Sequence, residues 1–137
     1  MYLLRDRTDE AGNQAFGFFK PDYRPRRAAT YLHNFTIILA DRGAVARPGR
    51  LLYTLAEQPA TVHDLLLQRS DGTFFLVVWG ERLKGSDEVT VRLGATYPAV
   101  RVYDPTAGTE PVRTLRRVAA LQLTVTDHPL ILAVEPK

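Results

Sequence analysis

Three aromatic side chains in the second half of the chain are the residues best suited to contact a ligand. Trp79 and Tyr103 fall in segments of β character, and Tyr97 lies in the loop-like stretch ATYP. The face of an exposed ring can stack on the apolar face of a sugar, using the flat surface that makes aromatic pairs stable. For Trp79, in phase with Phe75 and Val77, we expect packing in the core or against a helix instead. Tyr97 and Tyr103 are therefore the better candidates for carbohydrate binding, and Trp79 is kept as a third candidate.

Acidic side chains form the second candidate set, because two carboxylates about 5–10 Å apart can hydrolyse a glycosidic bond by acid/base chemistry. Most of them lie at predicted strand ends or turns, where acidic residues are common for structural reasons. No pair stands out, and the sequence therefore predicts no catalytic residue. The acidic residues considered are Asp64, Glu81, Asp87, Glu88 and Asp104.

Cofactor and metal chemistry find no support in the sequence. The chain has no P-loop, no GxGxxG, no HExxH and no GxSxG motif. His33, His63 and His128 lie far apart, and none has a second ligand-type residue at metal-binding spacing. We therefore expect no cofactor and no metal site.

The composition is that of an ordinary globular protein. The 137 residues suffice for one domain with a sizeable core, and 45% of them are hydrophobic and 24% charged. The net charge is only +3, and the basic clusters near 24–27 and 113–117 are short, so we expect no nucleic-acid partner. No apolar run is long enough to cross a membrane. The start, MYLLRDRTDE, does not resemble a signal peptide, and the lack of cysteine leaves the compartment open.

One helix is predicted, over residues 26–42. Apolar residues recur there at helical spacing, and Pro25 suits a helix start because its missing N–H costs nothing at that position. Gly43 suits the position just after the helix. His33 and Asn34 lie on the opposite, polar side of the helix. The apolar stripe consists of Ala28, Tyr31, Leu32, Phe35, Ile38 and Leu39.

The rest of the chain has the pattern of short β-strands. Apolar and polar residues alternate in 88–94 and 119–127, as one buried face requires, and Ser70-Asp71-Gly72 is a hairpin signal. The run FFLVVW is apolar on both faces, which predicts a central strand covered on one side by the helix. We expect a mainly β fold: an antiparallel β-sandwich of about seven or eight strands with one N-terminal helix packed on it. The predicted strands span residues 50–57, 61–69, 73–82, 88–94, 99–104, 112–117, 119–127 and 129–135.

The order of these segments resembles a known family. A short strand ending in LLRD, a polar loop with TDEAG and the stretch FGFFKPDYRPRRAATYLHN resemble the last strand, loop and helix of the catalytic (β/α)8 barrel in bacterial retaining glycoside hydrolases. The SDGT turn with FFLVVW, and the terminal DHPLIL with EP, resemble the β-sandwich that follows such barrels. The resemblance covers nearly the whole chain.

The resemblance implies two parts: a barrel-derived strand, loop and helix in residues 1–43, and a β-sandwich domain in residues 44–137. The family's catalytic glutamates lie on barrel strands four and seven, which have no counterpart here, so no catalytic residue carries over and no enzyme activity is implied. The implied function is that of a non-catalytic accessory domain in polysaccharide degradation, with a glycoside hydrolase barrel or carbohydrate as its partner. A secreted or extracellular location is implied as well.

Two other functions stay open on the sequence alone. The chain can be a stand-alone carbohydrate-binding module that uses exposed aromatic residues, or a small sandwich-fold enzyme or interaction protein, because sandwiches host many functions. Clustered exposed rings favour sugar binding, whereas buried rings with an apolar patch elsewhere favour docking to a partner domain. Residues 1–19 would lack their barrel neighbours, so homo-oligomerisation through this segment is a further expectation.

Overall fold

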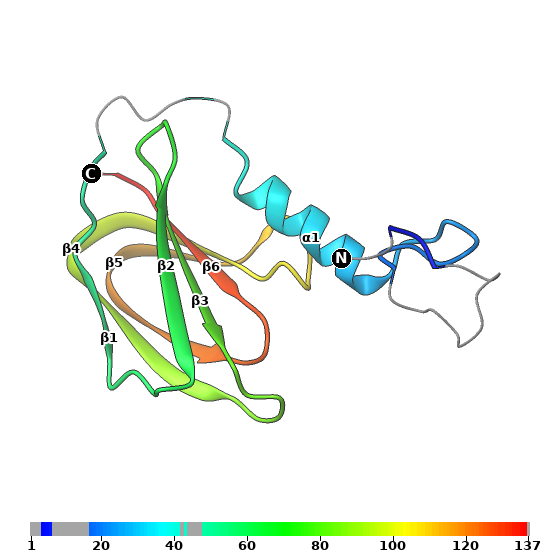
Figure 1. Cartoon of the computed structure of the whole chain (residues 1–137). Coiled ribbons are helices and arrows are strands. Elements are labelled where there is room, and N and C mark those ends of the chain that lie inside the picture. Colours follow the sequence, from blue (N-terminus) through cyan, green and yellow to red (C-terminus); the bar gives the residue numbers. More distant parts are fainter. Residues whose placement is uncertain (1–3, 7–16, 42, 44–47, 137) are drawn as a thin grey trace.

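The computed structural model describes residues 4–6, 17–41, 43 and 48–136. One helix and six strands are present there, and the strands form an antiparallel sheet in the order β1-β4-β6-β3-β2, with β5 paired to β4. The sheet curls strongly, and α1 lies across its outer side (Figure 1). The elements are α1 Arg27–Ile38, β1 Tyr53–Ala56, β2 Val62–Gln68, β3 Phe74–Gly80, β4 Asp87–Tyr103, β5 Pro111–Val125 and β6 Leu130–Val134.

The strand β3 occupies the central position that its sequence predicts. It pairs with β2 on one side and with β6 on the other, so its backbone groups are satisfied on both edges. Leu76 and Val78 point to the inner side of the curl, while Phe75 and Val77 point outward to α1. Both faces are covered, which explains a run that is apolar at every position.

Two long bent strands replace four of the predicted short ones. The predicted strands 88–94 and 99–104 both fall on β4, the second one reaching one residue beyond it, and 112–117 and 119–127 overlap β5. The β4–β5 register shifts between Arg92 and Tyr97, and Arg117 in β5 has a left-handed φ of 53°. A bulge bends a strand without ending it, so the interruptions in the sequence pattern mark bends rather than turns.

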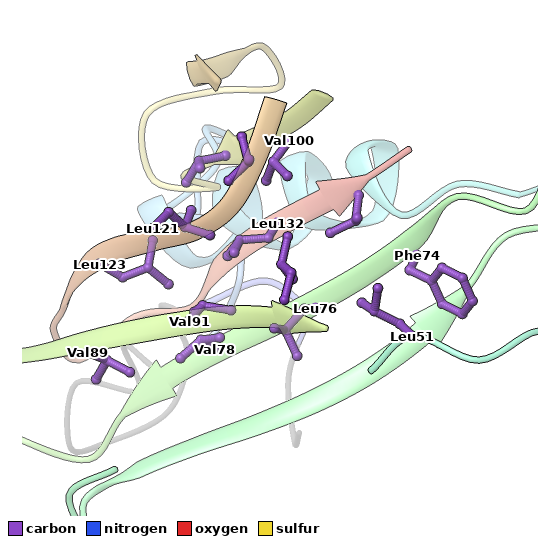
Figure 2. Close-up of a cluster of buried hydrophobic side chains, with 14 of the residues drawn as sticks. Leu51, Phe74, Leu76, Val78, Val89, Val91, Val100, Leu121, Leu123 and Leu132 are labelled. Atoms are coloured by element: carbon purple, nitrogen blue, oxygen red, sulfur yellow. The ribbon is translucent and has the colours of Figure 1, made fainter. Parts of the chain in front are cut away.

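The inner side of the curled sheet encloses one hydrophobic core. Val89 and Val91 of β4 point toward Leu76 and Val78 of β3, as Figure 2 shows. The alternation in 88–94 and 119–127 predicted this buried face correctly, because every second residue is buried from 87 to 93 in β4 and from 121 to 125 in β5. The buried core residues are Leu51, Val62, Phe74, Leu76, Val78, Val89, Val91, Leu93, Val100, Val102, Val118, Leu121, Leu123, Val125, Leu132 and Val134.

The predicted fold class is confirmed at the level of a mainly β protein with one helix packed on it. A sandwich of two separate sheets is not confirmed, because hydrogen bonds connect all six strands into one sheet. The sheet bends over itself where β4 and β5 curve, and this curvature brings its two ends face to face across the core (Figure 1). Curling therefore achieves the burial for which a second sheet was expected.

The helix covers the outer side with only part of its predicted stripe. Ile38 is buried against Phe75 and Val77, and Phe35 packs beside it. Leu32 was expected in the buried stripe but is 50% exposed. Asn34, expected on the polar side, is buried and donates a hydrogen bond from Nδ2 to the backbone oxygen of Pro105, 2.8 Å away. The helix is therefore rotated toward the loop after β4, because that loop offers a partner for the buried amide.

The helix also ends earlier than predicted. It stops at Ile38, and Gly43 lies too far along the chain to follow its last turn. Asp41 accepts hydrogen bonds from Ser70, at 2.7 Å from the backbone N and 2.6 Å from Oγ. These hydrogen bonds connect the segment after the helix to the β2–β3 turn. The chain therefore runs from the end of the helix toward this turn and does not continue as a helix to residue 42.

The segment before the helix is held by a buried carboxylate. Asp6 accepts a hydrogen bond from the backbone N of Gly17 at 2.7 Å and pairs with the guanidinium of Arg26, whose Nε is 3.1 Å away. The hydrogen bonds from Arg26, opposed by burial, hold the pKa of Asp6 below its usual value. Phe19 forms isolated bridges with Arg5 and Pro25. The residues 4–6 and 17–26 thus form a small unit next to the helix start, while the predicted division at residues 43 and 44 stays a prediction.

Candidate functional surface on the outer side of the sheet

The outer side of the sheet gathers most of the candidate residues. Side chains alternate along each strand, so the outward positions of β2, β3, β6 and β4 lie on the face that α1 partly covers. Leu65 of β2 lies opposite Val77 of β3, and Leu67 lies opposite Phe75. The helix therefore shares this face with the outward side chains of β2.

Trp79 lies on this outer face and is partly buried. Its ring stands 5.6 Å from the ring of His63, its cross-strand neighbour, at an angle of 35°. It also packs against the outer cluster of Ile38, Phe75, Val77, Ile131 and Ala133. His63 Nε2 in turn lies 3.0 Å from a carboxylate oxygen of Glu81. One side of the indole is thus covered by His63 of β2 and by this cluster, in line with the expectation that Trp79 packs in the core or against the helix.

Tyr97 and Tyr103 point to different sides of the sheet. Tyr97 packs against the inner core, beside the bend in β4. Tyr103 lies on the outer face, opposite Ile131 of β6, and packs against the helix cluster. The structure therefore places Trp79 and Tyr103 on one face and separates Tyr97 from them. All three rings are half-buried, so a flat platform of stacked rings finds no support in their placement.

Exposed leucines lie on the same outer face as Trp79. Leu65 is 50% exposed and Leu67 is 37% exposed on β2, and Leu32 is 50% exposed on α1. Leu65, Leu67 and Trp79 share the outer face of β2 and β3, and we name these three residues the outer apolar surface. Single exposed leucines are ordinary, but apolar side chains on one face that is already partly covered by a helix suggest a further partner.

An apolar pocket lies at the first half of the helix. It has a volume of about 330 Å³ and joins α1 to the segment before it and to two loops at the end of the sheet. His128 forms one wall, with Nε2 3.5 Å from a carboxylate oxygen of Asp104. The lining residues are Phe18, Tyr31, Leu32, Phe35, Pro105, Thr106, His128 and Pro129.

A second, polar pocket lies at the other end of the helix. It has a volume of about 240 Å³ and is bordered by the β2–β3 turn, by β4 and by the loop after β4. Neither of its arginines, nor its position, was singled out from the sequence, and Tyr103 is its only predicted site residue. The lining residues are Ile37, Ile38, Arg69, Asp71, Thr73, Phe75, Arg101, Tyr103, Thr109 and Ala133.

Three of the five acidic candidates, Asp64, Asp87 and Asp104, accept hydrogen bonds from the protein. Asp87 accepts from Thr61 Oγ1 and from Arg82 Nε, each at 2.8 Å, and these bonds hold its pKa below the usual value. Asp64 accepts from the hydroxyl of Tyr53 at 2.5 Å. Burial raises the pKa of Asp104, but hydrogen bonds from Thr106 outweigh it, and the net shift is downward. These contacts fit carboxylates that stabilise turns and strand ends.

Comparison with known proteins adds no family to this description. No protein-family model matches the chain, and no curated protein matches it. Within the described residues, no group of three or more His, Cys, Asp and Glu side chains could hold a metal ion. In the same part of the chain, no helix has both the length and the apolar character needed to cross a membrane.

Proposed function

We propose that the chain acts as a non-catalytic accessory domain of a glycoside hydrolase and packs through its outer apolar surface on the catalytic barrel. The proposal rests on the resemblance of the segment up to and including α1 to the last strand, loop and helix of such a barrel. In that arrangement the rest of the barrel lies beside α1, on the outer side of the sheet.

The observation that carries this proposal is the exposure of leucines on that same side. Leu65 and Leu67 belong to β2 and lie opposite Val77 and Phe75 of β3, the outer side chains against which Ile38 of the helix packs. Burying such side chains at an interface is favourable by about 25 cal/mol per Å² of apolar surface. The half-buried state of Trp79 supports docking over sugar stacking, because its ring already packs against His63 and the outer cluster.

A binding measurement with a separate barrel tests the proposal. The chain is titrated calorimetrically into a bacterial retaining glycoside hydrolase barrel that has been produced without its last strand, its last helix and its own β domain. We expect saturable one-to-one binding with a negative heat-capacity change, the signature of apolar burial. The double variant Leu65→Ser/Leu67→Ser should weaken this binding by about tenfold or more, equivalent to about 1.4 kcal/mol.

The matched control carries the same substitutions on exposed leucines elsewhere. Leu52 is 52% exposed and Leu83 is 93% exposed, and neither belongs to the outer apolar surface. Leu52→Ser/Leu83→Ser should bind like the unchanged chain. Equal loss in both double variants, or no heat of binding at all, would reject docking through this surface.

An activity measurement tests the non-catalytic part of the proposal. The chain alone should not hydrolyse aryl-glycosides. Reproducible turnover that one Asp or Glu substitution abolishes, for example at Asp64, would assign the chemistry to the chain itself.

A further inference from the structure

The apolar pocket at the first half of α1 lies where the sheet does not cover the helix. Ile38, in the last turn, is buried against the sheet, and Phe35 borders both the outer cluster and the pocket. Tyr31 and Leu32, which helical spacing assigned to the same apolar stripe, line the pocket instead, and Leu32 is 50% exposed. The first half of the stripe therefore faces a hollow of about 330 Å³ and not a packed neighbour.

Four separate parts of the chain supply the walls of this pocket. They are the segment before the helix, the helix itself, the loop after β4 and the turn between β5 and β6. Most of the lining side chains are aromatic rings or prolines, and the surface of the pocket is apolar: the rings are those of Phe18, Tyr31 and Phe35, and the prolines are Pro105 and Pro129. A ligand in this pocket would therefore contact apolar groups from all four parts.

Hydrogen bonds hold the walls in place. Asn34 Nδ2 of the helix donates to Pro105 O at 2.8 Å, which fixes the loop after β4 to the helix. On the opposite side of the pocket entrance residues, the backbone N of Arg26 donates to Phe18 O at 2.8 Å and fixes the segment before the helix. The pocket is therefore formed before a ligand arrives, and binding does not have to order its walls.

The two polar side chains that line the pocket are already engaged by the protein. Thr106 Oγ1 donates to Asp104 Oδ1 at 2.6 Å. His128 Nδ1 lies 3.0 Å from Thr126 Oγ1, and its Nε2 lies 3.5 Å from Asp104 Oδ2. These contacts stabilise the loop after β4 and the turn between β5 and β6, and they leave apolar contact as the main interaction that the pocket offers to a ligand.

We propose that this pocket binds a small, uncharged aromatic compound of one or two rings. Its volume of about 330 Å³ lies at the lower end of the range for ligand sites, which are concave, largely preformed and mostly apolar. Aromatic rings attract one another in offset and edge-to-face arrangements beyond the effect of buried area alone. Three aromatic side chains around one hollow therefore favour an aromatic ligand over an aliphatic one.

The charges near the pocket disfavour an anionic ligand. No Lys or Arg side chain is among the lining residues, and the carboxylates of Asp104 and Asp127 both contact His128. An ionised group would lose its hydration in the pocket without gaining a partner of opposite charge. A sugar would pay a similar cost for its hydroxyl groups, because each would need a hydrogen-bond partner that the apolar surface does not provide.

The site does not depend on barrel docking. None of its lining residues belongs to the outer apolar surface, and the test below uses the chain alone. Failure of barrel binding therefore leaves this inference standing, and failure of aromatic-ligand binding leaves the docking proposal standing.

The test is an NMR titration of the chain with indole, an uncharged two-ring compound, with glucose as the polar comparison. We expect saturable shifts of the backbone amide signals of Leu32, Thr106 and His128, with a dissociation constant of about 1 mM or lower. Glucose should produce no saturable shift at these amides. Absence of saturation with indole, or glucose binding of comparable affinity, would overturn the proposal.

A second pair of ligands tests the preference for an aromatic ring. Phenol and cyclohexanol have the same ring size and one hydroxyl group each, and they differ in aromaticity. Phenol should bind about threefold or more tightly than cyclohexanol, because only its ring can form aromatic pairs with the pocket. Equal affinities would refute the assignment to an aromatic ligand.

Variants connect the binding to the walls of the pocket. Leu32→Ser removes a half-exposed apolar side chain, so the chain should stay folded while the indole affinity falls about threefold or more. Phe18→Leu keeps an apolar side chain but removes a ring, and it should reduce the preference for phenol over cyclohexanol. Leu52→Ser is the matched control, because Leu52 is 52% exposed and lies outside this pocket. Unchanged indole affinity in Leu32→Ser, an unchanged phenol preference in Phe18→Leu, or an equal loss in Leu52→Ser would refute the site.

Discussion

At the scale of single residues, one side-chain hydrogen bond connects two strands that share no backbone pairing. The strands β1 and β2 lie at opposite ends of the strand order, yet the Tyr53 hydroxyl of β1 donates to Asp64 of β2 at 2.5 Å. Burial, together with the Asp64 carboxylate, raises the pKa of Tyr53 from 10.0 to about 12. Both effects disfavour the tyrosinate form in the folded protein.

This shift predicts a loss of stability at high pH. The contribution is fully present below pH 10 and is lost as the pH rises from 10 to about 12, because the unfolded tyrosine ionises first. Urea unfolding across this range should show a steeper fall for the unchanged chain than for Tyr53→Phe. At pH 7, Tyr53→Phe should be less stable by about 1–2 kcal/mol, since it leaves Asp64 without this donor. Tyr23→Phe, at a tyrosine that is 71% exposed, should retain the steep fall.

At the scale of elements, substitutions of two adjacent isoleucines test whether burial against the sheet stabilises the helix. Ile38 is 7% exposed against the outer face, whereas Ile37 is 51% exposed. Ile38→Ala should lower the free energy of unfolding by about 2–3 kcal/mol, and Ile37→Ala by about 0.5 kcal/mol or less. Urea denaturation followed by Trp79 fluorescence gives both values. Similar values for the two variants would mean that burial on the sheet does not hold the helix.

The elements also show where sequence periodicity stops being informative. Alternation identifies buried positions such as Val89 and Leu123, because a strand with one buried face imposes that pattern locally. It cannot distinguish a bend from a turn, so β4 and β5 were each expected as two strands. Asn34 was assigned to the polar side for a similar reason, since only the tertiary contact with the loop after β4 explains its burial.

At the scale of the whole molecule, the polar pocket was beyond reach of the sequence. The hairpin signal at Ser70-Asp71-Gly72 correctly located the β2–β3 turn, and Arg101 falls in a predicted strand. Their meeting depends on β6 lying between β3 and β4, because Ala133 must align with both Phe75 and Arg101. Strand order is a long-range property that no local pattern encodes. A search for arginines flanking predicted turns is the one sequence signal that could have included Arg69.

A second question about the whole molecule is whether the segment before the helix unfolds together with the sheet or separately from it. The Asp6 carboxylate holds Gly17 and Arg26, while the backbone N of Phe19 donates to Leu4 O at 3.0 Å and that of Arg26 to Phe18 O at 2.8 Å. Because none of these bonds reaches the sheet, this segment should be able to open while the sheet stays folded. Since the pKa of Asp6 is lowered, its stabilising effect is present above its ordinary value of 3.8 and is lost as the pH falls below it.

Asp6→Ala should therefore open this segment and leave the sheet intact. Hydrogen exchange followed by NMR should speed up at the amides of Phe19 and Arg26 and stay slow in β3, whose two edges are both paired. The control Asp22→Ala removes an ion pair between Asp22 and Arg24. The Asp22 side chain is 46% exposed, and exposed ion pairs contribute little to stability. It should leave both groups of amides unchanged. Faster exchange in β3 of Asp6→Ala would instead join the two parts into one cooperative unit and argue against a boundary at residues 43 and 44.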